Sequence, residues 1–248
     1  MKEIPALSNF IRKAVKFFYR KITVEGIENL PDEPVILVGN HSQAHGAIIS
    51  QLYHPRKCYT WTIAEMMHIK EVPAYAYGDF WSKKPVYIRW LFKLISYIIA
   101  PVAAYVMTYG ETIGVYKDAR VINTIKETCD TLSEGADVII FPECYEEHNN
   151  IVHEFQEGFV DVARFYYKKT KKNLPFVPMY LCPELKKVII GKPIYYNAEG
   201  DKKAEPARIC TYLMDEISEM AYNLPPHTVV PYPNIPKKYY PTNERPRT

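Results

Sequence analysis

Two short, uninterrupted runs of apolar residues most constrain the fold of this chain, because each ends abruptly at polar residues. Val35-Ile36-Leu37-Val38 leads directly into Gly39-Asn40-His41-Ser42, and Val138-Ile139-Ile140-Phe141 leads into Pro142-Glu143. A continuous aliphatic run of this kind is typical of a strand that is buried on both faces of a sheet. Open α/β sheets place ligands at the carboxyl ends of such strands. The first run therefore predicts a functional site at Asn40, His41 and Ser42.

Patterns of helix and strand alternate along the rest of the chain. Apolar residues at three- and four-residue spacing predict helices, and short apolar runs bounded by Gly or Pro predict strands. The expected helices are 6–21, 121–132, 157–169 and 208–221, and the further strands are 22–25, 176–180 and 187–190. Because strand and helix alternate without repeats, we expect one α/β domain over residues 22–224, with a mixed central sheet flanked by helices. Residues 1–21 form a basic amphipathic helix before it, and residues 225–248 an extended, Pro-rich basic tail after it.

The amino-terminal helix is apolar on one face and basic on much of the rest. Its apolar residues are Leu7, Phe10, Ile11, Ala14, Val15 and Phe18. This pattern is typical of a helix in a membrane interface, and equally of a helix that packs its apolar face on the domain. Residues 85–109 are the most apolar part of the chain, but Arg89, Lys93 and Pro101 interrupt them. We expect a membrane-dipping, groove-lining or ordinary buried helix there, rather than a transmembrane one.

The charge distribution and the cysteine content indicate the kind of binding partner and the cellular compartment of the protein. The net charge is +3 and both ends of the chain are basic, which suits an anionic partner such as phospholipid headgroups or nucleic acid. The 21 tyrosines suit a membrane interface or a binding groove, or simply replace Phe in the core. The five cysteines are scattered and odd in number, and Met1 leads into a basic stretch rather than an apolar signal. We therefore expect a reducing, cytoplasmic setting.

Five short blocks follow one another along about residues 20–195. They are Gly26-Ile27-Glu28-Asn29-Leu30-Pro31 with the following strand and Asn40-His41, Ile113-Gly114-Val115-Tyr116-Lys117, Phe141-Pro142-Glu143, Leu174-Pro175-Phe176-Val177-Pro178-Met179, and Gly191-Lys192-Pro193-Ile194. In order and spacing they resemble the lysophosphatidic acid acyltransferase family, within the glycerolipid acyltransferase superfamily. The resemblance implies a single mixed α/β domain similar to glycerol-3-phosphate acyltransferase, acting in phospholipid biosynthesis at a membrane.

The resemblance also implies roles for particular residues. An acceptor hydroxyl is a poor nucleophile, and His41 holds the position of the base that takes its proton as it attacks an acyl thioester. Asn40 and the amides after it hold the turn or stabilise the tetrahedral oxyanion. Glu143 matches a glutamate of the acceptor site. Lys117 matches a cation that holds the acceptor's phosphate, with Arg120 one turn further on. Without the resemblance, His41 can equally cap a turn, and both cations can be solvated surface charges.

The chain departs from the family at the residue that orients the histidine. Gly46 stands where the family has an aspartate. The loss of an orienting aspartate can lower the rate by about 10⁴ in serine proteases. The tautomer and basicity of His41 therefore depend on another carboxylate or a backbone acceptor. Glu143 is the first candidate and Glu146 or Glu147 the next, while His45 can act as a second base or a relay.

The third block departs as well. After Phe141-Pro142-Glu143 the chain reads Cys144-Tyr145-Glu146-Glu147-His148, where the family has Gly-Thr-Arg-Ser. Acid in place of the arginine favours a cationic or neutral acceptor, such as an amine or a sugar hydroxyl, over a phosphate. We expect Ser42, Cys144 and Tyr145 to contact substrate together with Lys117 and Arg120. Cys144 can in principle accept the acyl group, but nearby carboxylates disfavour its thiolate, so we expect it to pack.

Residues 143–154 are rich in potential metal ligands. His148 and His153 occur there with Glu143, Glu146, Glu147 and Glu154, in a spacing that matches no standard metal motif. We expect a solvated loop and no metal. The chain has only 10 glycines, and no glycine-rich motif follows a strand, so a nucleotide-binding loop is not predicted.

Three hypotheses for the function follow. The first is an acyltransferase that moves a fatty acyl group from an acyl-carrier-protein or coenzyme A thioester to a lysophospholipid-like or other hydroxyl or amine acceptor. The second is a catalytically silent relative that binds lipids or acyl carriers, and the third is a thioesterase-like hydrolase. The acyl thioester is expected as a co-substrate, with no permanently bound cofactor. The expected partners are the membrane lipid surface and the acyl carrier, not nucleic acid, and the expected place is the cytoplasmic face of the membrane.

Overall fold

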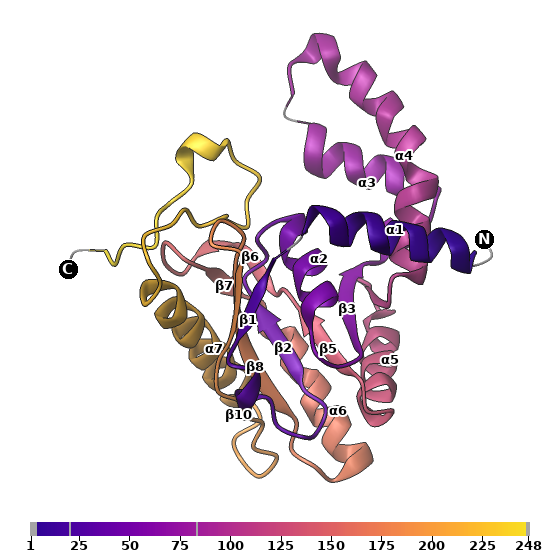
Figure 1. Cartoon of the computed structure of the whole chain (residues 1–248). Helices are drawn as coiled ribbons and strands as arrows, with labels where there is room; N and C mark the ends of the chain where they lie inside the picture. The colour runs from indigo at the N-terminus through magenta and orange to yellow at the C-terminus, as the bar shows by residue number, and fades with distance from the viewer. Residues whose placement is uncertain (1–3, 20, 83, 247–248) are drawn as a thin grey trace. The chain divides into compact units, whose positions relative to one another are not determined.

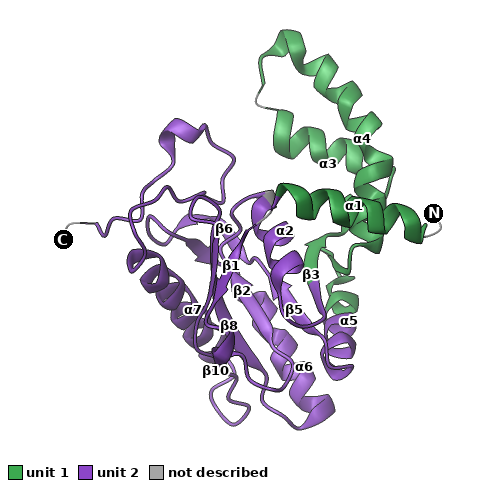
Figure 2. Cartoon of the chain, viewed as in Figure 1, with its two compact units in different colours: residues 1–18, 60–124 green, residues 19–59, 125–248 purple. Residues whose placement is uncertain are grey.

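The computed structural model describes residues 4–19, 21–82 and 84–246 of the chain. The chain divides into two compact units, residues 1–18 with 60–124 (unit 1) and residues 19–59 with 125–248 (unit 2), coloured green and purple in Figure 2. The labels of Figure 1 mark the helices and strands of both. The fold is mixed α/β with a central, mostly parallel sheet flanked by helices, as the alternating sequence pattern predicts.

The sheet of unit 2 places β2 at its centre. Its strands lie in the order β1-β9-β8-β2-β5, and β10 pairs with β8. β2 is parallel to both neighbours, with Leu37 opposite Ile139 of β5 and Val177 of β8, and all four of its residues are buried. The bounds are β1 Thr23–Glu25, β2 Ile36–Gly39, β5 Asp137–Ile140, β8 Pro175–Cys182, β9 Lys187–Ile190 and β10 Ile194–Tyr195. The apolar runs therefore form buried parallel strands, as predicted.

Helices pack on this sheet and close its core. α2 packs against β5 and β8, and α7 packs against β8. The core between α2 and the sheet includes Leu37, Ile49, Ile139 and Met179. The helices are α2 Ala44–Tyr53, α5 Val121–Ser133 (its first four residues in unit 1), α6 Asp161–Thr170 and α7 Glu205–Tyr222, with one-turn helices at Ile27–Asn29, Glu157–Val160 and Lys237–Tyr239. A hairpin of β6 (Glu143–Glu147) and β7 (His153–Phe155) forms a separate antiparallel pair.

Unit 1 is mostly helical. Its elements are α1 Pro5–Phe18, α3 Val72–Ala76, α4 Arg89–Tyr109, β3 Cys58–Ile63 (its first two residues in unit 2) and β4 Thr112–Val115, with short turns at Ala64–Met67, Tyr77–Trp81 and Val86–Ile88. β3 and β4 are parallel, with Trp61 opposite Ile113. The hydroxyl of Tyr105 on α4 accepts a hydrogen bond from the N–H of Ile4 and donates one to its carbonyl, each 2.9 Å long. This bridge fastens the start of α1 to α4.

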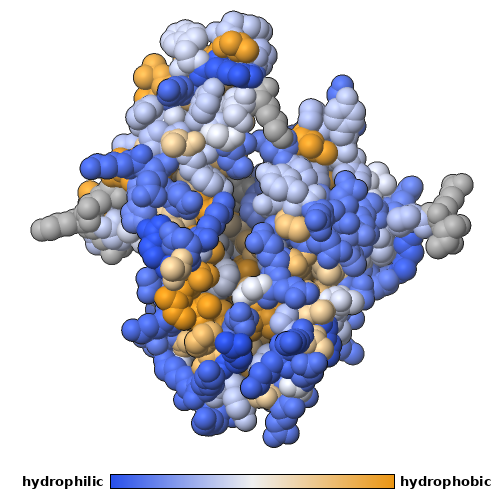
Figure 3. Space-filling model, turned by 180° about the vertical axis from the view of Figure 1, so that it is seen from behind, coloured by the Kyte–Doolittle hydropathy of each residue, from blue (hydrophilic) through white to orange (hydrophobic). Residues whose placement is uncertain are grey.

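The helices of unit 1 leave many apolar side chains exposed. α1 has no buried residue, and Phe10 and Phe18 are 69% and 81% exposed. On α4, Trp90, Tyr97 and Ile98 are each at least 60% exposed. In length and composition the stretch Val86–Tyr109 is sufficient to cross a membrane, a property that buried helices of soluble proteins also show. On the face of the protein in Figure 3, orange hydrophobic side chains likewise lie in patches among blue hydrophilic ones.

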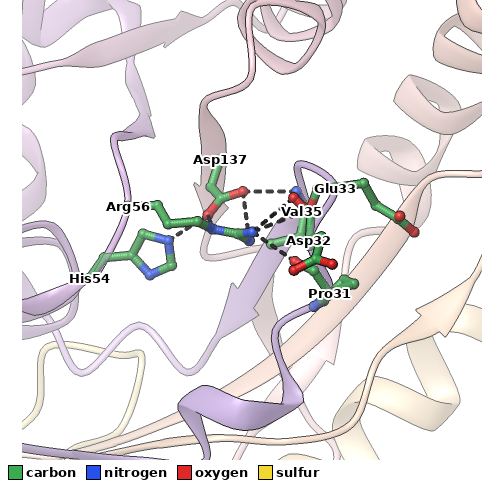
Figure 4. A network of polar contacts seen from close by, with 7 residues as sticks. All are labelled: Pro31, Asp32, Glu33, Val35, His54, Arg56 and Asp137. Atoms are coloured by element: carbon green, nitrogen blue, oxygen red, sulfur yellow. Dashed lines mark hydrogen bonds and ion pairs between the residues drawn. The ribbon is translucent and has the colours of Figure 1, made fainter.

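A buried carboxylate joins the amino-terminal ends of β2 and β5 (Figure 4). Asp137 is 1% exposed, and its oxygens accept hydrogen bonds from Arg56 Nε at 2.8 Å and from the N–H of Val35 at 2.9 Å. His54 Nε2 lies 2.6 Å from the same carboxylate. Because β2 and β5 are parallel, this network lies at the edge opposite to His41. It is a structural clamp between strands and the segment that follows α2.

The predicted helices and strands are confirmed, but several elements were not anticipated. These are α2, α3, β3, β4, β6, β7 and β10. The tail also differs from the extended segment that its prolines predict. Thr228 and Thr242 form an isolated antiparallel bridge, and buried Asn243 donates through its amide to the carbonyl of Ala221 at the end of α7. Side-chain hydrogen bonds to the backbone thus fold the tail back on itself.

Candidate active site

The turn after β2 is anchored by Asn40. This side chain is 1% exposed; its oxygen accepts from the N–H of Leu181 at 2.8 Å, and its nitrogen donates to the Leu181 carbonyl at 3.1 Å. The same nitrogen donates to Ser42 Oγ at 2.8 Å. The amide therefore fastens the end of β2 to β8 and the turn to itself. Asn40 holds the turn, which is one of the two roles expected of it.

The backbone of the turn is strained next to His41. Ser42 and Gln43 have φ angles of 44° and 54°, in the left-handed region that residues with a Cβ disfavour. Each such residue costs of the order of 1–3 kcal/mol and persists only where its surroundings hold it. Ser42 is fully buried, and α2 begins directly after the turn, at Ala44. Strain of this kind is concentrated at functional sites.

Glu143 ties the end of β5 to this turn. Its Oε2 accepts a 2.5 Å hydrogen bond from the backbone N–H of His41, and its Oε1 accepts a 3.0 Å bond from the N–H of His153. The side chain is 3% exposed. Burial raises the pKa of Glu143 to about 7, although the two N–H donors act in the opposite direction. The carboxylate expected to pair with the His41 ring thus makes hydrogen bonds to backbone groups and positions the main chain of His41.

The ring of His41 lies between two aromatic side chains. Phe141, at the end of β5, contacts it edge-on with the ring centroids 5.6 Å apart. Tyr232, from the carboxy-terminal tail, contacts it at 5.5 Å with an interplanar angle of 80°. The residue is partly exposed. His41 is therefore a partly exposed residue whose imidazole is packed between two aromatic rings, with its Nδ1 buried.

His45, in the first turn of α2, has a different partner. Its Nδ1 lies 2.8 Å from the hydroxyl of Tyr19, and the two rings are in contact. Partial burial lowers the pKa of His45, and the positive charge of Lys237 lowers it further. A lowered pKa keeps the imidazole neutral near pH 7. The expected second base is thus a neutral imidazole that is hydrogen-bonded to a tyrosine.

Gly46 explains in physical terms why an aspartate is absent here. A Cβ at this position would lie 2.2 Å from the carbonyl oxygen of His41 and 3.2 Å from a ring carbon of Phe141. The first contact is with backbone, which cannot rotate away as a flexible side chain can. The first turn of α2 therefore approaches the His41 main chain so closely that only glycine fits.

Substitution of Gly46 by aspartate is expected to damage the protein rather than restore a family-like pair. The variants Gly46→Asp and Gly46→Ala should each lower the free energy of unfolding by about 1–3 kcal/mol, because both introduce the same Cβ. Chemical denaturation measures the change. Gly158→Ala is the matched control, since a Cβ there would meet nothing within 4 Å. A Gly46→Asp variant as stable as the wild type would show that a carboxylate fits beside His41.

The β6–β7 hairpin carries the residues of the altered third block. Cys144 is partly exposed, and Tyr145 is 73% exposed with its ring 5.5 Å from that of Tyr232. His148 pairs with Glu154 at 2.9 Å. Within residues 4–19, 21–82 and 84–246, no group of three or more His, Cys, Asp and Glu side chains is placed to hold a metal ion.

Lys117 and Arg120 belong to unit 1, whereas His41 and Glu143 belong to unit 2. Arg120 forms a bidentate ion pair with Asp118, through contacts of 3.0 Å and 2.8 Å, and its guanidinium lies 4.5 Å from the centre of the Tyr116 ring. Lys117 is exposed. Arg120 is thus already paired with a carboxylate, which leaves Lys117 as the better candidate of the two for a substrate phosphate.

A polar, strained turn follows the middle strand of a largely parallel sheet, at the edge where open α/β folds bind ligands. The sequence model of the acyltransferase family matches residues 21–182, and the chain belongs to that family. It is an acyltransferase. A comparison with curated proteins gave no match.

The fold is also similar to that of a solved enzyme. The crystal structure of the 1-acyl-sn-glycerophosphate (LPA) acyltransferase PlsC from Thermotoga maritima superposes with a TM-score of 0.51 and 16% sequence identity. The match covers 91% of this chain and 86% of that one. At this identity the similarity establishes the fold, and the resemblance drawn from the five sequence blocks agrees with it.

Tyr232 is the residue of this site that sequence reasoning missed. It lies 191 positions beyond His41, in a tail expected to be extended. A signal does exist, because Tyr232 stands between Pro231 and Pro233, which fix the backbone on both sides. A rigidly held aromatic residue in a polar tail is unusual, but nothing in the sequence says which surface it contacts.

Proposed function

We propose that this acyltransferase moves a fatty acyl group from an acyl-carrier-protein or coenzyme A thioester to a hydroxyl or amine acceptor at a membrane surface, with His41 as general base. The acceptor oxygen or nitrogen attacks the thioester carbonyl while His41 takes its proton. The tetrahedral intermediate collapses, the carbon–sulfur bond breaks, and the thiolate recovers the proton from His41. Backbone N–H groups in the first turn of α2 are the donors we propose for the oxyanion.

The observation that carries the proposal is the meeting of two family blocks at the turn that bears His41. His41, at the end of β2, and Glu143, after β5, are joined by a hydrogen bond from the His41 main chain. The turn is strained, while Asn40 and Glu143 are buried and fully engaged in holding it. A rigid frame around a partly exposed histidine is what general-base catalysis requires.

The acceptor is proposed to be neutral or cationic. Glu146 and Glu147 are exposed on β6, three and four residues after the buried Glu143. Carboxylates there repel a phosphate and favour an amine or an uncharged hydroxyl. A lysophospholipid remains the second acceptor class, because Lys117 matches the cation that holds the acceptor's phosphate in the family.

A catalytically silent binding protein is the alternative, and Gly46 is the observation that favours it. Without a carboxylate at that position, a family member can keep the fold and bind acyl thioesters without turnover. The two functions differ in one measurement. Incubation with a radiolabelled acyl thioester and a total lipid extract yields labelled lipid only if the protein is active.

The test uses both thioester types and three acceptor classes: lysophospholipid, amine and neutral hydroxyl. The proposal expects labelled lipid with at least one acceptor. Retention of the labelled thioester on the protein without labelled lipid would establish the silent alternative. Labelled free fatty acid as the sole product would establish a hydrolase.

We also propose that unit 1 docks on the cytoplasmic face of the membrane. Phe10 and Phe18 of α1 and Trp90 of α4 are exposed apolar side chains, and Arg12, Lys13 and Lys16 lie on α1 among them. Aromatic and cationic side chains on one helix suit an anionic lipid interface. Tyr105 joins α1 to α4, and the exposed aromatic residues on these two helices support the docking of unit 1 on a membrane.

Removal of two aromatic side chains from α1 is expected to weaken membrane binding. The double variant Phe10→Ser with Phe18→Ser should bind vesicles that contain anionic phospholipid about tenfold or more weakly, since a buried Phe contributes about 1.5–3 kcal/mol. Vesicle sedimentation measures the binding. Ile27→Ser, an exposed apolar residue of unit 2, is the control. Equal binding of the double variant and the wild type would exclude α1 as the anchor.

A further inference from the structure

The carboxy-terminal tail forms a closed loop, residues 229–241, which we call the strap. Its ends are held together by the Thr228–Thr242 bridge and by the bond from the N–H of Val229 to the carbonyl of Pro241 at 2.9 Å. In Figure 1 this loop, in yellow, leaves the end of α7 and returns past it toward the carboxyl terminus. The strap is therefore closed at its base and free to contact another surface with its far part.

Two asparagine side chains, one in the tail and one in the body of unit 2, fix the base of the strap. Asn243, 4% exposed, accepts from the N–H of His227 at 2.9 Å and donates to the Ala221 carbonyl at 2.8 Å. Asn150, after β6, donates to the Thr242 carbonyl at 2.7 Å. A base held by buried hydrogen bonds is expected to be ordered, because each of these polar groups would be costly to leave unpaired.

The far part of the strap lies against the turn that carries His41. Gln43 Nε2, on the strained turn, donates to the hydroxyl of Tyr240 at 2.9 Å. Lys237 is close enough to lower the pKa of His45. The ring of Tyr232 contacts three other rings, those of His41 at 5.5 Å, Tyr145 at 5.5 Å and His153 at 6.0 Å. The hydrogen bond of Tyr240 and the ring contacts of Tyr232 thus bring the strap to the candidate active site.

An imidazole base must present one nitrogen to the reacting atom, and rotation about its two side-chain bonds destroys that alignment. Phe141 limits the ring from the side of β5, and Gly46 itself has no side chain to add to this packing. On another side the ring meets the edge-on packing of Tyr232, whose own backbone is held between two prolines. Edge-on aromatic packing has a preferred geometry, so this contact favours one ring orientation.

We propose that Tyr232 is a positioning residue of the acyl-transfer reaction, which holds the His41 ring in its reactive orientation through aromatic packing. The inference rests on the proposed function of His41. It assigns the strap to the active site and gives the tail a role in catalysis. Tyr232 acts through the orientation of His41 and takes no proton itself, so its loss should lower kcat and leave KM little changed.

The test compares Tyr232→Ala, Tyr232→Leu and Tyr232→Phe in the full-length protein. The Ala and Leu variants, which lack a ring, should lower kcat about ten- to hundredfold, a range expected for loss of alignment, with KM within about threefold of the wild type. The Phe variant keeps the ring and should retain most of kcat. Tyr239→Ala is the matched control, because this strap tyrosine is 62% exposed and its ring contacts Lys238. Thermal unfolding establishes that each variant is folded.

A second readout is independent of any substrate. The ring protons of His41 should show nuclear Overhauser contacts to the ring protons of Tyr232, and their chemical shifts should move in Tyr232→Leu and not in Tyr239→Ala. The proposal would be overturned if Tyr232→Leu kept the wild-type kcat, or if it changed only KM. A rise in kcat would also overturn it, by showing that the strap shields His41. If the wild type transfers no acyl group, the proposed function has failed. If transfer depends on His41 but not on Tyr232, only this inference has failed.

Discussion

Replacement of His41 by alanine should lower kcat/KM for acyl transfer about 10²- to 10⁴-fold, the range that a general base contributes. The hydrogen bond that Glu143 accepts comes from the His41 main chain, so the alanine variant keeps it. Asn40 holds the turn through Leu181 and does not depend on the imidazole. The substitution therefore removes a base and leaves its frame in place.

Initial rates of thioester consumption, with acceptor present and absent, measure this effect. His41→Gln should be as inactive as His41→Ala, because an amide cannot take a proton at neutral pH. His68→Ala is the control, since this histidine is exposed in unit 1. Activity of His41→Ala within a few-fold of the wild type would rule out His41 as the base, provided that both proteins unfold at the same temperature.

Replacement of Asp137 by alanine should give the largest loss of stability of any substitution considered, about 3–5 kcal/mol. The carboxylate is 1% exposed and holds Arg56, His54 and the N–H of Val35 together. Its removal leaves a guanidinium, an imidazole and a backbone N–H without their acceptor. Because Val35 begins the central apolar run, the loss is transmitted to the strand that ends at His41.

A second aspartate, in an exposed ion pair, serves as the control for the effect of burial on the loss of stability. Asp130 forms an ion pair of 2.7 Å with Lys169, but both side chains are about half exposed. Exposed pairs contribute little to stability, so Asp130→Ala should unfold almost as the wild type does. Urea denaturation followed by circular dichroism measures all three proteins. Equal midpoints for Asp137→Ala and Asp130→Ala would show that the network at the start of β5 is not a structural clamp.

The sequence predicted the sheet well because its strands are buried on both faces. The continuous apolar runs at 35–38 and 138–141 are by themselves sufficient to predict buried strands. They form β2 and β5, with the polar turn at the predicted edge of the sheet. By contrast, α2 was missed because residues 44–53 follow a turn and show little amphipathic pattern. The element that places Gly46 against His41 was therefore invisible until the structure was known.

The partners of His41 could not be predicted for a different reason. Periodicity and spacing predict which residues lie on strands and at strand ends. Aromatic contacts depend instead on which segments, distant in the sequence, pack against each other in the folded chain. Glu143 was correctly expected near the site, yet its hydrogen bonds are to backbone N–H groups of His41 and His153. Tyr232 came from a tail whose prolines predict extended structure. Asn243 and Thr242, which fold that tail back, have no recognisable sequence pattern.

The measurement that tests the central claim most directly follows two products in one time course: free thiol released from the acyl thioester, and labelled lipid formed from the acceptor. Acyl transfer with His41 as base predicts equal amounts of the two for the wild-type protein, and neither above background for His41→Ala. Thiol release without labelled lipid, or equal product from both proteins, would contradict the account.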